Sequence, residues 1–174
     1  MLPGTTKRQQ KPATPSRSFD LKPPAPMTIR EHPLAWRWTD PRHALLPDST
    51  LARIEPVESG EAKHLFQRSL RFLGRDCLSP DVFETVTRGS ADISANVGCV
   101  WLREQHADLT TRVYISWEQD VAVRTTWEIF TANWDDFCYP SSDDVIVWPE
   151  SESWALLYHH EQEFQFGRRR HHVS

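Results

Sequence analysis

A run of metal-binding side chains stands near the carboxyl end of the chain, where His159, His160, Glu161 and Glu163 fall within five residues. Neutral imidazoles and carboxylates that converge on one point are common ligands of divalent metal ions. The run is not an HExxH motif, and in a strand His159 and His160 point to opposite faces of the sheet. We therefore favour a polar hairpin loop at the sheet edge, and keep a metal-assisted hydrolase as the alternative.

Adjacent carboxylates occur twice, at Asp135 with Asp136 and at Asp143 with Asp144. Two acids at a suitable separation can divide the roles of general acid and general base in hydrolysis. Neighbouring aspartates in turns more often form Asx turns and helix caps, so we do not assign these four residues to catalysis.

Cys77, Cys99 and Cys138 are the three cysteines of the chain, and with His106 they would offer zinc ligands or a nucleophile and its base. Their spacings match no metal-binding pattern, and an isolated cysteine among apolar residues usually behaves as a small buried hydrophobe. An odd number of cysteines without close pairs indicates a reducing compartment. We therefore expect a cytoplasmic protein.

The motifs of several large enzyme classes are missing from the sequence. There is no P-loop, no GxSxG, no kinase signature and no glycine-rich phosphate loop, and the chain has only six glycines. Enzymes that depend on such motifs are disfavoured. We lean against an enzyme without deciding the point, and we expect no cofactor.

Four of the eight tryptophans lie between Thr125 and Gly167. Trp127 and Trp134 fall on the apolar stripe of an expected helix, where core packing explains them. Trp148 and Trp154 flank the turn PESES, and we expect them to be exposed and able to anchor a partner.

Charge is distributed unevenly along the chain, whose net charge is −4. Six basic residues against two acidic ones give residues 1–34 a charge of +4, whereas thirteen acidic residues against two arginines give residues 104–163 a charge of −11. An acidic domain repels a phosphate backbone, so we expect no nucleic-acid binding by the folded part. The run GRRRHH near the carboxyl end is typical of a solvated tail.

The elements that would position these side chains are clearest after Thr125. Apolar residues recur at helical spacing over 127–138, and Thr125 or Thr126 is suited to cap this helix. Three strands follow, at residues 145–148, 154–160 and 163–166. The second has apolar side chains on both faces, so we expect it to be central in an antiparallel meander.

Helices and one hairpin are predicted before the meander. Residues 59–74 form the clearest amphipathic helix, with Ser59 as N-cap and Gly74 just past its end. Strands at 111–117 and 121–127 would form a hairpin that leads into the next helix. The other segments predict a short strand at 34–38, short helices at 49–55 and 79–87, and either strand or helix at 96–104.

These elements together predict one α+β domain at residues 34–167, with helices followed by a β-hairpin, a helix and an antiparallel β-meander. Residues 1–33 are rich in Pro, Ser, Thr and Lys and should form a disordered basic tail, and residues 168–174 a second basic tail. No apolar run approaches 18 residues, and the N-terminus lacks the apolar region of a signal peptide, so we expect no membrane partner. Met27 is an alternative start of the chain.

The pattern TTWxxFxxNWxxF at residues 125–137 is followed by an acidic turn, a short strand, Trp, Tyr and a closing FxFG. Over residues 112–167 this arrangement resembles a family of small uncharacterised proteobacterial proteins, a domain of unknown function. A weaker similarity to the same family extends to AWRW at residues 35–38 and the helix-forming segment after it. The helix and hairpin ending is also similar in architecture to bacterial immunity proteins, which neutralise toxins. The resemblance implies no catalytic residue, and the long basic tail of this chain departs from it.

Three functions follow from these observations. We favour a small soluble bacterial interaction protein of immunity type, which neutralises a basic, toxin-like protein partner through an acidic face with tryptophan anchors. The residues expected to contact this partner are Glu118, Asp120, Glu128, Asp135, Asp136, Asp143, Asp144, Trp148 and Trp154. The alternatives are the metal-assisted hydrolase of His159, His160, Glu161 and Glu163, and a structural or assembly component of a phage or secretion apparatus. The oligomeric state is not predicted.

Overall fold

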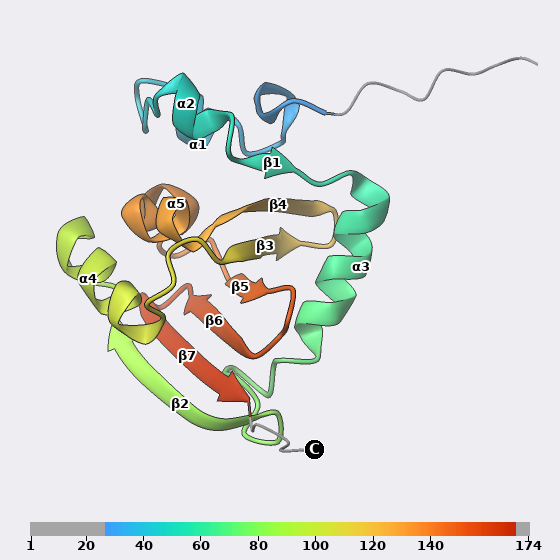
Figure 1. Cartoon of the computed structure of the whole chain (residues 1–174), viewed down its shortest axis with the longest axis vertical. Helices are drawn as coiled ribbons and strands as arrows, with labels where there is room; N and C mark the ends of the chain where they lie inside the picture. Colours follow the sequence, from blue (N-terminus) through green and yellow to red (C-terminus); the bar gives the residue numbers. More distant parts are fainter. Residues whose placement is uncertain (1–26, 170–174) are drawn as a thin grey trace, which may run out of the picture.

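An antiparallel sheet of seven strands forms the centre of the computed structural model, which describes residues 27–169 (Figure 1). The strand order is β1-β4-β3-β5-β6-β7-β2, and every neighbouring pair is antiparallel. The strands are β1 (Glu55–Pro56), β2 (Phe83–Ser90), β3 (Arg112–Glu118), β4 (Val121–Thr126), β5 (Val145–Pro149), β6 (Trp154–His159) and β7 (Glu163–Arg169). With helices packed on this sheet, the predicted α+β class is confirmed, and β6 is central as expected.

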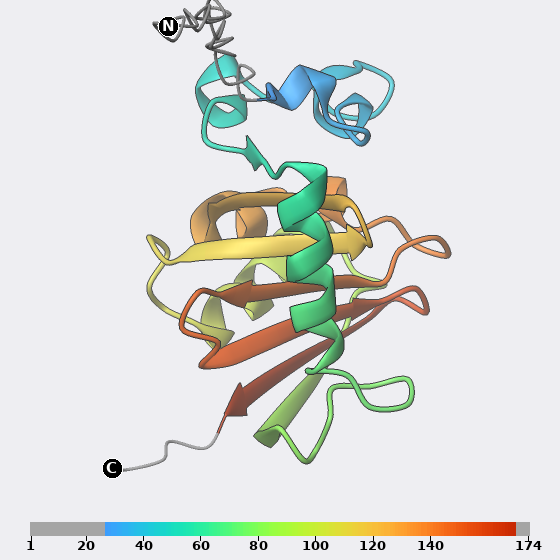
Figure 2. The same ribbon diagram turned by 90° about the vertical axis from the view of Figure 1, so that its right-hand side faces the viewer.

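Helices cover both faces of the sheet. α3 (Ser59–Leu70) crosses one face, while α4 (Ala95–Gln105), α5 (Trp127–Ala132) and α6 (Trp134–Phe137) lie against the other (Figures 1 and 2). The first described segment contains η1 (Ile29–Glu31), α1 (Trp36–Thr39) and α2 (Asp48–Leu51), and lies at the β1 end of the sheet. Within residues 27–169, no helix combines the length and the apolar character that crossing a membrane requires.

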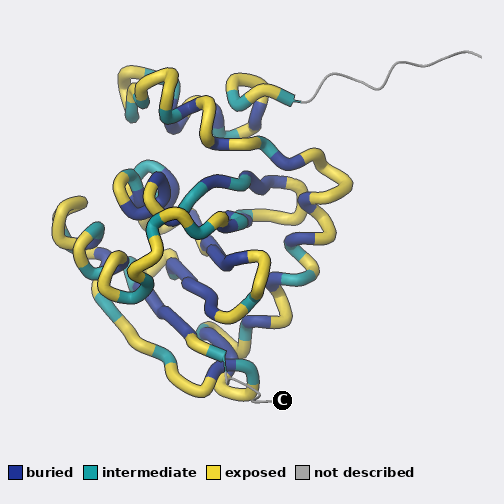
Figure 3. Tube along the Cα trace, viewed as in Figure 1, coloured by how far each residue is buried: buried dark blue, intermediate teal, exposed yellow. Residues whose placement is uncertain are grey.

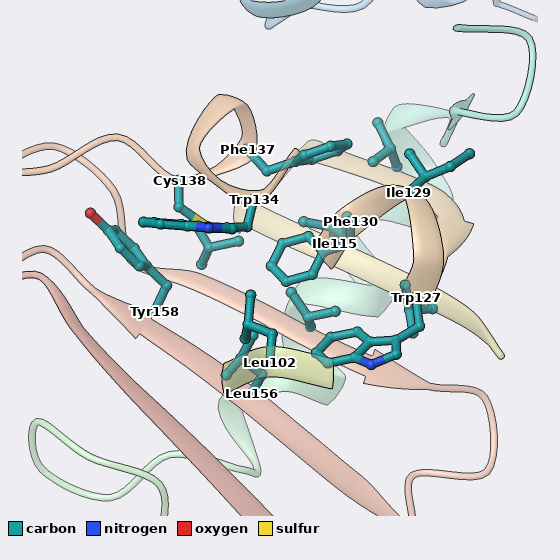
Figure 4. Packing of buried hydrophobic residues seen from close by; sticks show 14 of the residues in the cluster. Leu102, Ile115, Trp127, Ile129, Phe130, Trp134, Phe137, Cys138, Leu156 and Tyr158 are labelled. Atoms are coloured by element: carbon teal, nitrogen blue, oxygen red, sulfur yellow. The ribbon is translucent and has the colours of Figure 1, made fainter. Parts of the chain in front are cut away.

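The larger part of the hydrophobic core lies between the sheet and the helices α4 to α6 (Figure 4). Alternate residues of the strands point into it, among them Ile115 of β3 and Leu156 of β6. Trp127 packs edge-on against Trp154, with 5.0 Å between their ring centroids. Burial of each such aromatic side chain contributes about 1.5–3 kcal/mol. The aromatic stripe predicted for the helix after Thr126 is therefore confirmed as core.

A smaller cluster fills the opposite face, beneath α3. Ala62 and Leu65 of this helix, together with Phe72 just after it, pack against Trp148 and Leu157 of the sheet. Figure 3 shows that buried residues follow the strands and the inward side of α3, while its outward side is exposed. The helix predicted at 59–74 is thus confirmed, with its last turn ending at Leu70.

The predicted helix 127–138 is divided in two at Asn133. Thr126 caps α5, because its hydroxyl accepts a hydrogen bond from the backbone N–H of Ile129 at 3.4 Å. The side-chain amide of Asn133 donates to the carbonyl oxygen of Ile129 at 2.8 Å, which is the acceptor that its own backbone N–H would use in a continuous helix. The backbone of Asn133 leaves the helical region at this point, and α6 starts in a new direction.

Two of the predicted short elements are wrong. Residues 34–38 do not form a strand, because Trp36 begins the one-turn helix α1. Residues 79–87 do not form a helix: Ser79 accepts backbone hydrogen bonds from Val82 and Phe83 in a turn, and β2 then pairs with β7. The undecided segment 96–104 is helical, within α4.

The first residues of the structure are folded, although residues 27–33 were predicted to belong to a disordered tail. The buried ring of His32 lies 3.2 Å from the carbonyl oxygen of Ala122 through Nε2, and its Nδ1 accepts a hydrogen bond from the backbone N–H of Leu34. The rest of the predicted N-terminal tail, residues 1–26, lies outside the described residues, as do residues 170–174 of the C-terminal one. Arg168 and Arg169 still belong to β7.

Candidate functional site

Most of the acidic residues expected to form a partner-binding face are on the surface. Glu118 and Asp120 are exposed at the turn between β3 and β4, and Asp135 is exposed on α6. Glu128 is exposed on α5, where its carboxylate accepts a hydrogen bond from Arg53 at 2.9 Å. Asp144 is also exposed, at the start of the segment that leads into β5.

Asp143 is buried, contrary to the expectation that it belongs to an exposed acidic face. Its carboxylate oxygens accept hydrogen bonds from Arg37 Nη1 at 2.5 Å and Nη2 at 3.1 Å. The same carboxylate accepts from the backbone N–H of Tyr139 and from the hydroxyl of Ser142. The side chains of Arg37 and Asp143 are only 6% and 9% exposed. This ion pair therefore fastens α1 to the loop before β5.

The two tryptophans expected to be exposed anchors are buried, so that expectation is wrong. Trp148 is fully buried beneath α3, with its ring centroid 5.7 Å from that of Phe72. Trp154 is 3% exposed and packs between Trp127 and Phe166 in the larger cluster. The turn between them is polar, but both flanking strands point their tryptophans inward, one to each face of the sheet.

A different group of aromatic side chains is accessible, around α1. The ring of Trp36, which is 39% exposed, packs edge-on against His43 at 4.5 Å and against Tyr139 at 5.5 Å between centroids. The guanidinium of Arg37 lies 4.3 Å from the centroid of the Tyr139 ring and 5.3 Å from that of Trp36. Because the ion pair with Asp143 holds Arg37 in place, the rings of Trp36 and Tyr139 form cation–π contacts with a guanidinium in a fixed position.

Two carboxylates adjoin this aromatic group, because α6 packs against α1. Burial raises the pKa of Asp136 to about 6, and the neighbouring Asp135 adds to the effect. Burial also raises the pKa of Tyr139. The positive charge of Arg37 acts to lower this pKa, whereas the negative charges of Asp136 and Asp135 act to raise it. Among the described residues, the carboxylate of Asp136 has no hydrogen-bonding partner. Asp136 therefore carries a half-buried negative charge next to the negative charge of Asp135.

We call Trp36, His43, Asp135, Asp136 and Tyr139 the acidic-aromatic surface. The sequence indicated its two aspartates but not its three rings. Trp36 and Tyr139 stand about a hundred residues apart in the chain, and no periodicity links them. Of the two tryptophans in AWRW, Trp38 is fully buried and Trp36 is the exposed one, and the sequence does not distinguish them.

A second group of polar side chains converges where β6 ends. Asp144, His159 and His160 each offer a ligand atom, and these three atoms lie within 4.8 Å of one another. Asp144 Oδ1 accepts hydrogen bonds from the backbone N–H of His160 at 3.0 Å and from its ring Nδ1 at 2.9 Å. The two imidazole centroids are 4.1 Å apart. We call these three residues the histidine cluster.

The histidine cluster differs from the four residues that the sequence suggested. His159 ends β6 and the chain then turns, with Gln162 donating its backbone N–H to the carbonyl of His159, so the alternation of the strand stops before His160. The two rings therefore lie side by side rather than on opposite faces. Glu163 is directed elsewhere, pairing with Arg88 at 2.5 Å. The exposed carboxylate of Glu161 lies 3.9 Å from His159 Nδ1 but outside the group of three close ligand atoms. Asp144 takes the place of both glutamates.

Electrostatics within the histidine cluster favour a charged pair. The hydrogen bond to Asp144 raises the pKa of His160, and the negative charges of Asp144, Glu161 and Asp76 act in the same direction. Burial acts to raise the pKa of Asp144, but the hydrogen bonds from the ring and backbone of His160 outweigh it and hold that pKa below its ordinary value.

The cysteines do not come together. Cys138 is buried beneath α6, where burial raises the pKa of its thiol well above the ordinary value. Cys77 and Cys99 are half-buried in different elements, and His106 bonds to the hydroxyl of Thr111 at 2.8 Å. Within the part of the chain that the structure describes, the histidine cluster is the one group in which three candidate ligand atoms lie this close together.

A surface pocket of about 470 Å³ is lined mainly by charged side chains, and both of its arginines have partners. In it Arg124 pairs with Glu61, and Arg112 pairs with Glu55 at 2.7 Å. These two pairs neutralise the arginines that would have to bind an anionic ligand there.

Comparison with known proteins adds one relationship to this α+β domain with its two polar sites. Residues 97–167 match the model of a family described as a protein of unknown function, DUF2947. The match runs from α4 to β7 and thus contains Asp135, Asp136 and the histidine cluster, but not Trp36. No curated protein and no solved structure matched the chain. The expected similarity to a domain of unknown function is supported, whereas a proteobacterial origin and an immunity-type architecture stay predictions.

Proposed function

We propose that this protein acts in the bacterial cytoplasm by binding a basic protein partner through the acidic-aromatic surface, in the manner of an immunity protein that neutralises a toxin. The observation that carries the proposal is the environment of Asp136. Its carboxylate is half-buried, stands next to Asp135, and has no cationic neighbour among the described residues that balances it. A lysine or arginine of a partner would supply the missing charge.

The aromatic part of the surface is suited to anchor such a partner. Tryptophan and tyrosine are frequent at the energetically important positions of protein interfaces, because they bury a large area with few rotatable bonds. Trp36 and Tyr139 are already held in place by Arg37 and its ion pair with Asp143. Little conformational entropy is therefore lost when a partner covers these rings.

The wider charge distribution supports a basic partner. Residues 104–163 carry a charge of −11, and arginines outside this segment pair with Glu128, Asp143, Glu152 and Glu163. The exposed carboxylates of Glu118 and Asp120 extend the negative potential beyond the acidic-aromatic surface. Such a potential accelerates encounter with a cationic protein and is screened by salt. The same potential disfavours binding of a nucleic-acid backbone by the folded part.

The test uses the purified full-length chain as bait for the product of the adjoining gene, with the affinity measured at low and at physiological salt. We expect the affinity to fall as salt rises. It should also fall at least about tenfold in Trp36→Ala and in Asp135→Asn with Asp136→Asn, because interface anchors contribute about 2 kcal/mol or more. Leu70→Ala and Glu84→Gln serve as matched controls, since both side chains are exposed on other elements.

Binding that ignores salt and survives all three substitutions of the acidic-aromatic surface would refute the proposal. Reduced binding in the two control variants to the same degree would place the interface elsewhere. Unfolding curves of each variant are needed alongside, so that a loss of binding is not a loss of fold.

A further inference from the structure

The histidine cluster has the composition and spacing of a metal site. Two imidazoles and one carboxylate are a ligand set that suits Zn²⁺ and its neighbours in the first transition row, and catalytic zinc sites often keep three protein ligands with one open position. We propose that Asp144, His159 and His160 bind one divalent transition-metal ion, of which Zn²⁺ is the best match.

The present separations are close to those that a bound ion would require. Two ligand atoms that each lie about 2.1 Å from a tetrahedral ion are about 3.4 Å apart. The three candidate atoms lie within 4.8 Å of one another, so shifts of roughly 1 Å complete the geometry. The side chains of Asp144 and His160 are about half exposed, at 57% and 47%, and are free to make these shifts. His159, at 16%, is the fixed member.

The backbone around the histidine cluster is already arranged. The carboxylate of Asp144 is held by the backbone N–H of His160, and the backbone N–H of Ser141 donates to the carbonyl of His160 at 3.1 Å. These bonds join the loop before β5 to the turn between β6 and β7. The backbone that carries the three side chains is thus held by two separate segments, so mainly side-chain freedom is lost when an ion binds.

The fourth position would face a surface pocket of about 270 Å³. Leu73 and Leu157 contribute apolar surface to this pocket, and Asp76 and Cys77 also line it. Water fills an open position by default, and Asp76 and Cys77 are further protein donors within the same pocket. Leu73 and Leu157 lower the local polarity, which strengthens the attraction between the ion and its anionic ligands.

A polar turn with a single hydrogen-bonded pair is the simpler explanation for Asp144 and His160. In this turn His159 Nδ1 also accepts a hydrogen bond from the backbone N–H of Glu161 at 3.3 Å. That bond uses one ring nitrogen and leaves Nε2 to bind an ion, and the two imidazole centroids lie 4.1 Å apart beside the same pocket. Two neutral imidazoles and a carboxylate around one ion satisfy all three groups together.

The test measures Zn²⁺ binding to the full-length chain by titration calorimetry and by elemental analysis after gel filtration. His171 and His172 lie outside the described residues and could bind metal on their own, so all variants are made in a His171→Ala, His172→Ala background. We expect this background to retain one Zn²⁺ per chain. His159→Ala, His160→Ala and the near-isosteric Asp144→Asn should each weaken binding at least about tenfold, the smallest loss expected even of groups that only support a ligand.

Two controls test whether binding is specific to these three residues. His64→Ala removes an exposed histidine on α3, and Glu161→Gln removes the nearest glutamate of the run. Both should bind Zn²⁺ with unchanged affinity. Unfolding curves without metal show whether each variant is folded, and Asp144→Asn keeps the size of the side chain in case an alanine variant is not.

Substitution with Co²⁺ reports the coordination. A three-ligand site gives the visible absorption of a tetrahedral or five-coordinate ion, and a thiolate ligand would add a charge-transfer band that disappears in Cys77→Ser. The proposal is overturned if the background variant binds no stoichiometric Zn²⁺, or if the three ligand variants bind it as well as His64→Ala does.

Discussion

Replacement of Asp143 with alanine should cost this protein a large part of its stability. Without the carboxylate, the guanidinium of Arg37 keeps a single hydrogen bond, to the carbonyl of Phe137 at 3.2 Å, and its Nε already has no partner among the described residues. The backbone N–H of Tyr139 also loses its acceptor. Removing one member of a buried ion pair typically costs about 3–5 kcal/mol, and we expect about 4 kcal/mol here.

Such a loss is readily measured, because the whole stability of a domain is usually about 5–15 kcal/mol. For a chain of this size it corresponds to a fall of about 8–16 °C in Tm. Urea unfolding followed by tryptophan fluorescence gives the free energy directly, provided that the dependence on denaturant is unchanged between variants. Arg42→Ala is the matched control, because Arg42 also pairs with an aspartate, Asp40 at 2.6 Å, but its side chain is 84% exposed. It should cost far less than Asp143→Ala, because solvent screens an exposed ion pair.

A double-mutant cycle separates the ion pair from general damage to packing. Arg37→Met in the wild-type background should cost several kcal/mol, whereas in the Asp143→Ala background it should cost little, since the charge it removes has lost its partner. The reasoning is refuted if Asp143→Ala costs under about 1 kcal/mol, or if the cost of Arg37→Met is the same in both backgrounds.

Three further predictions concern other parts of the fold. Gly98→Ala should destabilise the protein by about 1–2 kcal/mol in urea unfolding, because the added Cβ would lie 2.5 Å from Nε1 of the buried Trp134. This cost outweighs the preference of alanine for helices. Gly60→Ala is the control: with no atom within 4 Å of its Cβ it should stabilise slightly, and equal effects of the two substitutions would contradict the packing argument. Asp136→Asn should raise the free energy of unfolding by about 1 kcal/mol at pH 8, allowing for partial exposure, and leave it unchanged at pH 4. The folded-state pKa of about 6 lies above the ordinary value of an aspartate. The stability that protonated Asp136 contributes is therefore fully present at low pH and is lost as pH rises through 6. A difference that does not vary between pH 4 and pH 8 would show that this titration is not its cause. Asn133→Ala should destabilise by about 1 kcal/mol through loss of the bond to Ile129, and a neutral result in the same unfolding assay would contradict the role given to this amide.

The long, regular elements could be predicted from the sequence because their periods extend over several residues. In β6 the alternation of Trp154, Leu156 and Tyr158 with Ala155 and Leu157 placed these residues on opposite faces, and the two core clusters confirm it. The apolar positions of α3 recur over three turns, enough to distinguish a helix from a strand. An element that packs against a sheet must place its apolar residues at regular intervals, so core residues can be recognised from their spacing in the sequence.

Short elements lack this redundancy. Leu34, Trp36 and Trp38 alternate like strand residues, but a four-residue helix is too short to show its 3.6-residue period. Ser79 and Pro80 are typical of a helix start, yet the residues after Val82 are β-formers, and pairing with β7 decides their structure. In both cases contacts that are distant in the sequence outweigh the local preference.

Both candidate sites lie where a regular element ends, which explains why the sequence located them only in part. His159 is the last residue of β6, so alternation wrongly separated it from His160, and Asp144 reaches the same point from the loop before β5. Tyr139 follows α6 and meets Trp36 only because Arg37 and Asp143 join distant segments. A polar side chain that binds a ligand or a partner has to stand outside the buried periodic face, and the period therefore carries no information about it. Residue type indicated the chemistry of His160 and Asp136, whereas their neighbours became visible only in the folded chain.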